Sequence, residues 1–257
     1  MRRSIAIVNQ KGGVGKSTTA VNLGACLADA GQRTLLVDLD PQANSTSGLG
    51  IPRDRGSSIY DLLLDGMALA DVVVSSPVPD LLVVPSSINL AGAEVELAGL
   101  VGRETRLRRI LDDADFPIVL LDCPPSLGLL TINALTAATE ALIPIQCEYY
   151  ALEGLTQLLQ SIELVRRHLN PTLEISGVAL TMYDSRTNLS DQVAAEVRRF
   201  FGDRVYNTVI PRSVRLAEAP SHGKPITIYD PSSRGAQAYQ ALAQEVIARG
   251  RQPSTAV

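Results

Sequence analysis

The chain alternates between short, almost uninterrupted apolar runs and longer stretches in which apolar residues recur at helical spacing. The apolar runs predict buried strands at 5–8, 33–38, 81–84, 118–122, 141–145, 175–181 and 205–210. The amphipathic stretches predict helices at 19–28, 90–100, 104–112, 129–138, 152–169, 190–201 and 234–248. Strands that are apolar throughout and alternate with amphipathic helices are typical of a parallel sheet covered by helices on both faces.

We therefore expect an α/β fold, with a single domain over residues 1–250 built on a doubly wound, mostly parallel sheet. No composition break, long linker or internal repeat divides the chain. Residues 42–58 are rich in Gly, Ser and Asn and predict a surface loop, and the small, polar residues 251–257 predict a disordered tail. Ligands of such sheets bind at the carboxyl ends of the strands, so we expect the chemistry there.

A glycine-rich loop follows the first predicted strand and leads into the first predicted helix. Strand, glycine loop and helix together are the context of a phosphate-binding loop, because glycines let backbone amides approach a phosphate and the helix N-terminus adds partial positive charge. Lys16 supplies a full charge for the outer phosphates, and the Ser17 hydroxyl suits a magnesium ion. The expected nucleotide-binding residues are Lys11, Gly12, Gly13, Val14, Gly15, Lys16, Ser17 and Thr18.

The loop departs from the common phosphate-loop pattern in one informative way. The pattern G-x-x-x-x-G-K-[ST] would place its first glycine at position 10, where this chain has Gln10, and a second lysine, Lys11, stands at the loop entrance. Of the 23 basic residues of the chain, only Lys11, Lys16 and Lys224 are lysine. A compact ammonium differs from a guanidinium in reach and hydration, so two lysines in one short loop indicate a specific role.

Three aspartates follow predicted strands and are expected to face this loop. Asp38 and Asp40 end the second strand, and in an extended segment they point to the same side. Asp122 ends the strand at 118–122 after four apolar residues, as in a Walker B pattern. We assign Asp38 and Asp122 to the magnesium site and Asp40 to orientation of the attacking water. An ordinary strand-end turn is the alternative for the segment around Asp38 and Asp40.

Composition limits the classes of protein that this chain can represent. Hydrophobic residues make up 46% and aromatic residues only 4%, without tryptophan, so the core must be aliphatic. The net charge is −4, so any binding to nucleic acid must use a local basic patch. Cys26, Cys123 and Cys147 lack disulfide or metal spacing, and neither a signal peptide nor a run long enough for a membrane span is visible. We therefore expect a cytoplasmic protein.

Five segments together resemble a known family. The run Lys-Gly-Gly-Val-Gly-Lys-Ser at 11–17 resembles the deviant Walker A motif of the ParA/MinD group of P-loop ATPases. The segments 38–44, 122–126, 148–154 and 210–225 resemble the ParA/Soj branch, which partitions chromosomes and plasmids. The resemblance covers nearly the whole chain and implies a P-loop ATPase that uses ATP and Mg²⁺, with weak basal hydrolysis to ADP and phosphate.

The resemblance also implies a cycle. The ATP-bound proteins form face-to-face homodimers, in which the residue at Lys11 reaches the partner's phosphates like an arginine finger given in trans. Lys16 and Asp40 complete the catalytic set, with Asp40 orienting the water. The dimer binds double-stranded DNA without sequence preference, and a ParB-like centromere-binding protein stimulates hydrolysis and release. The chain is thus expected at the nucleoid, without membrane attachment.

Further contacts are carried over by the same resemblance. The adenine contacts match Met182 and the segment Pro211, Arg212 and Ser213, where relatives often have Asn in place of Ser213. Glu148 is expected to touch the partner's nucleotide. Arg186 and Arg215 match arginines implicated in DNA contact, and Lys224 joins them in the late basic stretch; a solvated helix face is the alternative for such charges.

Three other functions remain as alternatives. A MinD-like division-site ATPase would need a C-terminal amphipathic helix, which Gly250 and Pro253 interrupt. An electron-transfer ATPase like the nitrogenase iron protein would need two cysteines per subunit for an iron–sulfur cluster, and Cys123 and Cys147 are the candidates. A small-molecule synthetase of the same superfamily would need substrate-binding residues that no motif identifies.

Overall fold

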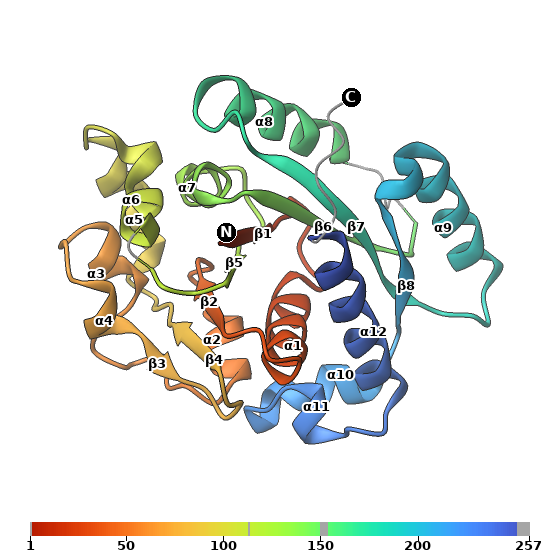
Figure 1. Ribbon diagram of the computed structural model, residues 1–257. Helices are drawn as coiled ribbons and strands as arrows, with labels where there is room; N and C mark the ends of the chain where they lie inside the picture. Colours follow the sequence, from red (N-terminus) through yellow and green to blue (C-terminus); the bar gives the residue numbers. More distant parts are fainter. Residues whose placement is uncertain (1, 113, 150–153, 251–257) are drawn as a thin grey trace.

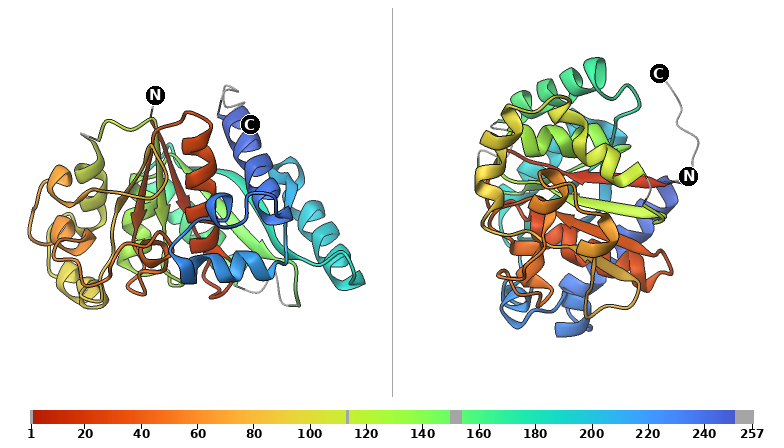
Figure 2. Two further views of the ribbon diagram at one scale, coloured as in Figure 1. Left: turned by 90° about the horizontal axis from the view of Figure 1, so that it is seen from below. Right: turned by 90° about the vertical axis from the view of Figure 1, so that its left-hand side faces the viewer.

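The computed structural model describes residues 2–112, 114–149 and 154–250. Strands and helices alternate along these residues and build one sheet with helices on both faces (Figures 1 and 2). The predicted tail at 251–257 and the first two residues of the helix predicted at 152–169 lie outside the described residues. Within the described residues, no helix is both long enough and apolar enough to cross a membrane.

The sheet has eight strands in the order β3-β4-β2-β5-β1-β6-β7-β8. The β3–β4 pair is antiparallel and the other described pairs are parallel. The strands are β1 Arg3–Ile7, β2 Thr34–Asp38, β3 Val74–Ser75, β4 Leu81–Val84, β5 Ile118–Asp122, β6 Glu140–Gln146, β7 Glu174–Tyr183 and β8 Val205–Pro211. The doubly wound, mostly parallel sheet predicted from the apolar runs is confirmed, and β3 is a short additional strand.

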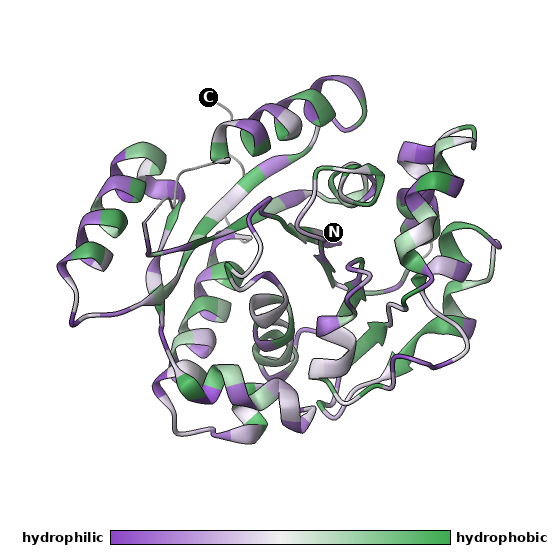
Figure 3. Cartoon of the chain, turned by 180° about the vertical axis from the view of Figure 1, so that it is seen from behind, coloured by the Kyte–Doolittle hydropathy of each residue, from purple (hydrophilic) through white to green (hydrophobic). Residues whose placement is uncertain are grey.

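The helices pack in two layers, and each layer has its own aliphatic core. Leu23 and Leu27 of α1 share one core with Leu242 and Val246 of α12, and residues of α5 to α9 form the core on the other face. In Figure 3 hydrophobic residues gather on the strands, whereas α8 and α9 alternate between hydrophobic and hydrophilic residues. The longer helices are α1 Lys16–Asp29, α5 Leu90–Ala98, α6 Arg106–Asp112, α7 Leu129–Ala137, α8 Leu155–His168, α9 Asn188–Phe201 and α12 Arg234–Arg249.

The short helices were not predicted, because elements of this length carry too little periodicity to show in the sequence. They are α2 Asn44–Gly48, α3 Ile59–Leu63, α4 Leu69–Val72, α10 Val214–Glu218 and α11 Ile226–Tyr229, with 3-10 turns η1 Arg103–Thr105, η2 Gly202–Arg204 and η3 Ala219–His222. The prediction of a surface loop at 42–58 is wrong in its first part. This segment contains α2, in which Ser45 and Thr46 are fully buried.

Two glycines join the segment after α2 to the C-terminal part of the chain. Gly50 and Gly223 both have positive φ angles, +72° and +62°. A Cβ atom added to Gly223 would lie only 2.6 Å from the Cα of Gly50, closer than real Cβ contacts allow. The backbones of the segments that follow α2 and η3 therefore touch directly, and only glycine at position 223 permits this approach.

We expect Gly223→Ala to lower the free energy of unfolding by about 1–3 kcal/mol more than the matched change Gly66→Ala, because it adds overpacking to backbone strain. Gly66 has a similar φ of +72° but nothing within 4 Å of an added Cβ, so its substitution reports the strain alone. Urea denaturation of both variants measures the difference. Equal losses would show that the contact between Gly50 and Gly223 is not tight.

Candidate active site

The carboxyl ends of neighbouring parallel strands bring the glycine loop and the aspartates together. β5 lies between β1 and β2 in the sheet. Asp122 at the end of β5 is in register with Ile7 of β1 and with Asp38 of β2. The loop that follows β1 therefore meets the two carboxylates at one edge of the sheet.

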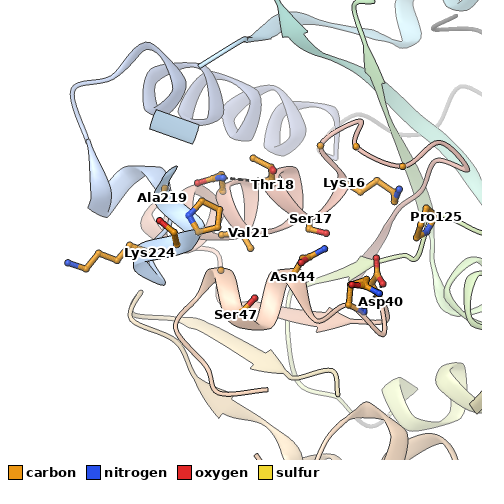
Figure 4. Close-up of a pocket in the computed structure, with 18 of the residues that line it drawn as sticks. Lys16, Ser17, Thr18, Val21, Asp40, Asn44, Ser47, Pro125, Ala219 and Lys224 are labelled. Atoms are coloured by element: carbon orange, nitrogen blue, oxygen red, sulfur yellow. Dashed lines mark hydrogen bonds between the residues drawn. The ribbon is translucent and has the colours of Figure 1, made fainter. Parts of the chain in front are cut away.

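A cavity of about 550 Å³ opens at this edge. Figure 4 shows Lys16, Ser17, Thr18 and Val21 from the start of α1 on one side, facing Asp40, Asn44 and Ser47 on the other. Of the predicted site residues, those that line the cavity are Gly12, Gly13, Gly15, Lys16, Ser17, Thr18, Asp40, Met182 and Lys224.

The glycine loop has the backbone of a phosphate-binding loop. Gly13 and Gly15 have φ angles of +76° and +88°, and Gly15 is the residue that precedes α1. The loop is fixed at both sides, since the Thr181 hydroxyl donates to the Val14 carbonyl at 2.8 Å and the Asn9 side chain accepts from the Lys11 amide at 3.0 Å. The glycines thus leave the amide groups at the start of α1 directed toward the cavity.

Lys16 is a buried cation among acids. Its side chain is only 6% exposed, and its ammonium donates to the Lys11 carbonyl at 3.1 Å. Burial lowers the pKa of Lys16, and the nearby Asp122 and Asp40 oppose this shift. An anionic ligand in the cavity would give this ammonium a stronger partner than a neutral carbonyl.

Asp38 is fully buried and accepts three hydrogen bonds. Its Oδ2 accepts from the Thr46 amide at 2.8 Å and from the Thr46 hydroxyl at 2.7 Å, and its Oδ1 accepts from the Asp40 amide at 3.1 Å. Burial and the neighbouring charge of Asp122 raise the pKa of Asp38, whereas the bonds from Thr46 lower it. Three of the roughly four acceptor positions of the carboxylate are thus occupied, so Asp38 has little capacity left for a metal ion.

Asp122 is also fully buried, but it keeps one oxygen available. Its Oδ2 accepts from the Ser45 hydroxyl at 2.7 Å, whereas its Oδ1 has no hydrogen-bond partner among the described residues. Burial raises the pKa of Asp122 to about 6, against the opposing influence of Ser45, Ser17 and Lys16. A buried carboxylate oxygen without a partner, next to the Ser17 hydroxyl, fits the oxygen donors that Mg²⁺ prefers.

Asp40 lies at the cavity wall and is held by its own loop. It is 6% exposed, its Oδ1 accepts from the Gln42 amide at 2.9 Å, and its carbonyl accepts from the Ala43 amide at 2.8 Å. The carboxylate therefore has a defined orientation beside the cavity.

Of the other predicted nucleotide contacts, one is among the described residues that line the cavity, and the rest are not. Met182 lines the cavity with a positive φ of 51°, but Pro211, Arg212 and Ser213 are not among the described residues that line it. Arg212 instead pairs with Glu148 at 2.7 Å. The Ser213 hydroxyl accepts from the Leu216 amide and caps α10.

The basic residues predicted to contact DNA are all exposed at the surface, and both arginines are paired with carboxylates. Arg186 is 84% exposed and forms two hydrogen bonds with Asp184. Arg215 lies 3.1 Å from Glu218 and 3.6 Å from Asp230. Lys224 is at the far end of the cavity, with its amino group directed away from Lys16 and Asp40 in Figure 4.

Several residues that line the cavity were missed from the sequence. They are Val21, Asn22, Gln42, Asn44, Ser47, Gly48, Arg53, Pro125, Ala219, Pro220 and Ser221. Asn22 follows Thr18 by one helical turn, and its side chain connects the Thr18 carbonyl with the Ile226 amide, both at 2.7 Å. The helical spacing from Ser17 and Thr18 was a signal in the sequence for Val21 and Asn22. Most of the others depend on the placement of α2, η3 and the segments beside them.

The cysteines do not have the environment of reactive thiolates or cluster ligands. Cys123 and Cys147 are 0% and 1% exposed. Burial raises the pKa of Cys123 well above its ordinary value and that of Cys147 to about 11. A thiolate ligand needs the opposite shift, so this environment disfavours an iron–sulfur cluster at these residues.

Comparisons with known proteins agree with the geometry. A family model described as an AAA domain matches residues 2–175. The chain is 59% identical to the sporulation initiation inhibitor protein Soj of Bacillus subtilis (strain 168), over 97% of this chain and 100% of that protein. It is 54% identical to the chromosome partitioning protein ParA of Caulobacter vibrioides (strain NA1000 / CB15N), over 97% of this chain and 95% of that protein.

A solved structure is similar over a comparable length. Cobyrinic acid a,c-diamide synthase from Mycobacterium smegmatis, with bound ADP and magnesium, superposes with a TM-score of 0.86. The identity is 38%, and the match covers 98% of this chain and 96% of that one.

The raised pKa of Asp122 predicts how stability depends on pH without nucleotide and magnesium. The folded protein keeps this proton up to about pH 6, whereas the unfolded chain releases it near pH 4. Folding therefore takes up a proton between these values, and the contribution of Asp122 to the free energy of unfolding falls as pH rises. As pH rises from 4 to 7, we expect the free energy of unfolding of Asp122→Asn to increase on the order of 1–3 kcal/mol relative to that of wild type.

Asp184→Asn serves as the control that should not respond over this range. The Arg186 side chain lowers the pKa of Asp184, so the contribution of Asp184 is fully present above the unfolded-state pKa of about 4 and is lost only at lower pH. Thermal unfolding across this pH range compares both variants with wild type. A constant difference between wild type and Asp122→Asn would contradict the raised pKa.

Proposed function

The chain belongs to the Soj/ParA family of chromosome-partitioning ATPases, and from this membership we propose that it couples hydrolysis of magnesium-bound ATP to reversible DNA binding. The observation that carries the proposal is that Lys16 and Asp40 line one cavity beside the glycine loop, with the buried Asp122 close to Lys16. A cation for phosphates, a carboxylate for a metal ion and a carboxylate for water are the parts that phosphoryl transfer to water requires.

The amides at the start of α1 and the Lys16 ammonium would hold the phosphates of ATP, and Ser17 and Asp122 would hold Mg²⁺. Similar structures support this assignment, since the synthase from M. smegmatis was solved with ADP and magnesium. Magnesium, when bound, neutralises charge that develops on phosphate oxygens. Asp38 remains a proposed member of the magnesium site, and it lies beside Asp122 on the neighbouring strand, where Thr46 and Asp40 bond to it.

Asp40 would orient the attacking water. Its Oδ1 is engaged by the Gln42 amide at 2.9 Å, so the orientation of the carboxylate is fixed before a ligand arrives. The side chain is 6% exposed and lines the cavity. A fixed carboxylate on the cavity wall can accept a hydrogen bond from water without reorganisation during the reaction.

Lys11 would act on the ATP of a second copy of the chain in a homodimer. Its backbone belongs to the loop, but its side chain is not among the described residues that line the cavity. Gly12 and Gly13 next to it are exposed, so the loop faces outward at this point. A lysine that projects from the loop entrance can add a positive charge at a partner's phosphates, as an arginine finger does.

The remaining steps follow from the family. An ATP-bound homodimer would bind double-stranded DNA without sequence preference, through Arg186, Arg215 and Lys224, and would act at the nucleoid in the cytoplasm. A ParB-like centromere-binding protein would stimulate hydrolysis and release. Met182, Pro211, Arg212, Ser213 and Glu148 remain proposed nucleotide contacts.

We expect Asp40→Ala to bind ATP but to lose hydrolysis about 100-fold or more, the range for loss of a general base or water-orienting group. DNA binding of wild type should require ATP and fail with ADP or no nucleotide, and Asp40→Ala should remain on DNA in ATP. Electrophoretic mobility shift in the three nucleotide states measures this. DNA binding that is the same in all three nucleotide states, or no DNA binding in any of them, would refute the switch.

Lys11→Ala should keep ATP affinity within about threefold of wild type and lose partner-stimulated hydrolysis by 10²-fold or more.

A mixing experiment tests whether Lys11 acts across the dimer. In a mixed dimer, the Lys11→Ala subunit keeps its own Asp40, and the Asp40→Ala subunit supplies the Lys11 that this site needs. One of the two sites is therefore complete. Equal amounts of the two inactive variants should therefore recover about a quarter of wild-type hydrolysis, because half of the dimers are mixed and each has one complete site. No recovery in the mixture would mean that Lys11 acts within its own subunit.

A further inference from the structure

Residues 38–46 form a loop whose two ends are bonded to each other. Asp38 at the end of β2 accepts two hydrogen bonds from Thr46 of α2, from the amide at 2.8 Å and from the hydroxyl at 2.7 Å. Both residues are 0% exposed. Hydrogen bonds to a buried carboxylate are charge-assisted and stronger than neutral ones, so this pair closes the loop firmly.

Asp40 lies inside the closed loop and is attached to the same carboxylate. The other oxygen of Asp38 accepts from the Asp40 amide at 3.1 Å. Asp38 therefore fixes Thr46 with one oxygen and the backbone of Asp40 with the other. Any movement of Thr46 that tilts the Asp38 carboxylate also changes the position of Asp40.

The loop is strained in a way that requires this anchor. Ala43 has a φ of +51°, in the left-handed region that residues with a Cβ avoid. This conformation costs about 1–2 kcal/mol and persists only where surrounding bonds impose it. The amide of Ala43 donates to the Asp40 carbonyl at 2.8 Å, so the strained residue is directly connected to Asp40.

The Thr46 hydroxyl also reaches a third segment. It accepts from the Ser86 amide at 2.9 Å, in the stretch that follows β4. One hydroxyl thus connects α2, the end of β2 and the segment after β4, because it donates its hydrogen to Asp38 and its oxygen accepts from the Ser86 amide. A side chain without a hydroxyl would leave the Ser86 amide unpaired and Asp38 with one bond fewer.

We propose that Thr46 is a positioning residue for hydrolysis, which holds Asp40 in place through Asp38. This inference rests on the proposed role of Asp40 in orienting water. Thr46 itself is fully buried and is not among the described residues that line the cavity, so it acts through Asp38 and not on the nucleotide.

The test uses Thr46→Val, which keeps the shape of threonine and removes the hydroxyl, and Thr46→Ser, which keeps the hydroxyl. Partner-stimulated kcat should fall about tenfold or more in Thr46→Val, because a small displacement of a catalytic group has large effects, while the dissociation constant for ATP stays within about threefold. Thr46→Ser should restore most of the rate. In the nucleotide-free protein, amide hydrogen exchange at Gln42 and Ala43 should quicken in Thr46→Val.

Ser45→Ala is the matched control. Ser45 is the neighbouring residue of α2, is equally buried, and donates a bond of the same 2.7 Å length to Asp122 instead of Asp38. Its loss should raise the magnesium concentration needed for tight ATP binding, by about tenfold, and leave exchange at Gln42 and Ala43 unchanged. If Ser45→Ala quickens this exchange as much as Thr46→Val, the hydroxyls merely stabilise α2 and the inference is wrong.

Other outcomes separate this inference from the proposed function. Normal stimulated hydrolysis in Thr46→Val, with Asp40→Ala inactive, would overturn the role of Thr46 alone. Normal hydrolysis in Asp40→Ala would overturn the proposed function. If Thr46→Val does not fold, Thr46→Cys has nearly the same size and a much weaker hydrogen-bond donor, and it should show the same loss of kcat and faster exchange; wild-type behaviour of that variant would refute the inference.

Discussion

Two buried carboxylates side by side are the constraint around which the site is built. Asp38 and Asp122 end neighbouring parallel strands in the same register, and neither is exposed. Removal from water and mutual repulsion both disfavour their charged forms. The ammonium of Lys16 and the hydroxyls of Ser17, Ser45 and Thr46 are among the groups that offset this effect. The burial of α2 follows, because its polar residues stabilise the charges that the sheet brings together.

This constraint also explains how the C-terminal segment is attached to the site. The carboxylates hold α2 through Ser45 and Thr46, and Gly50, two residues beyond α2, lies against Gly223, which follows η3. α1 holds the same segment at a second point, where Asn22 accepts from the Ile226 amide at 2.7 Å. The segment from α10 to α11 therefore rests on the two helices that form opposite sides of the cavity. A ligand that changes the separation of α1 and α2 must act on this segment as well.

The sequence was sufficient for features that local pattern determines. Uninterrupted apolar runs predicted the seven longer strands, and the glycine loop predicted the start of α1, although the helix begins at Lys16 and not at residue 19. Asp38 and Asp122 could be placed at one edge because parallel strands end on the same side. The helix α2 could not be predicted, since the burial of Ser45 and Thr46 depends on Asp122, Asp38 and the packing of α2 against α1 and η3, which the local pattern does not show. The pairing of Arg212 with Glu148 likewise depends on tertiary structure.

Charge pairing bears directly on how an acidic chain could hold DNA. Arg186 and Arg215 are exposed, and each is already paired with a carboxylate on the same surface. Exposed ion pairs contribute little free energy, so a phosphate can replace the carboxylate as partner at small cost, but one such exchange also yields little affinity. Each phosphate contact adds to the counterions released, and two copies in a dimer double the number of contacts. If the chain binds DNA as proposed, weak, paired arginines would favour binding that depends on dimerisation, because a single copy would make only half of the phosphate contacts.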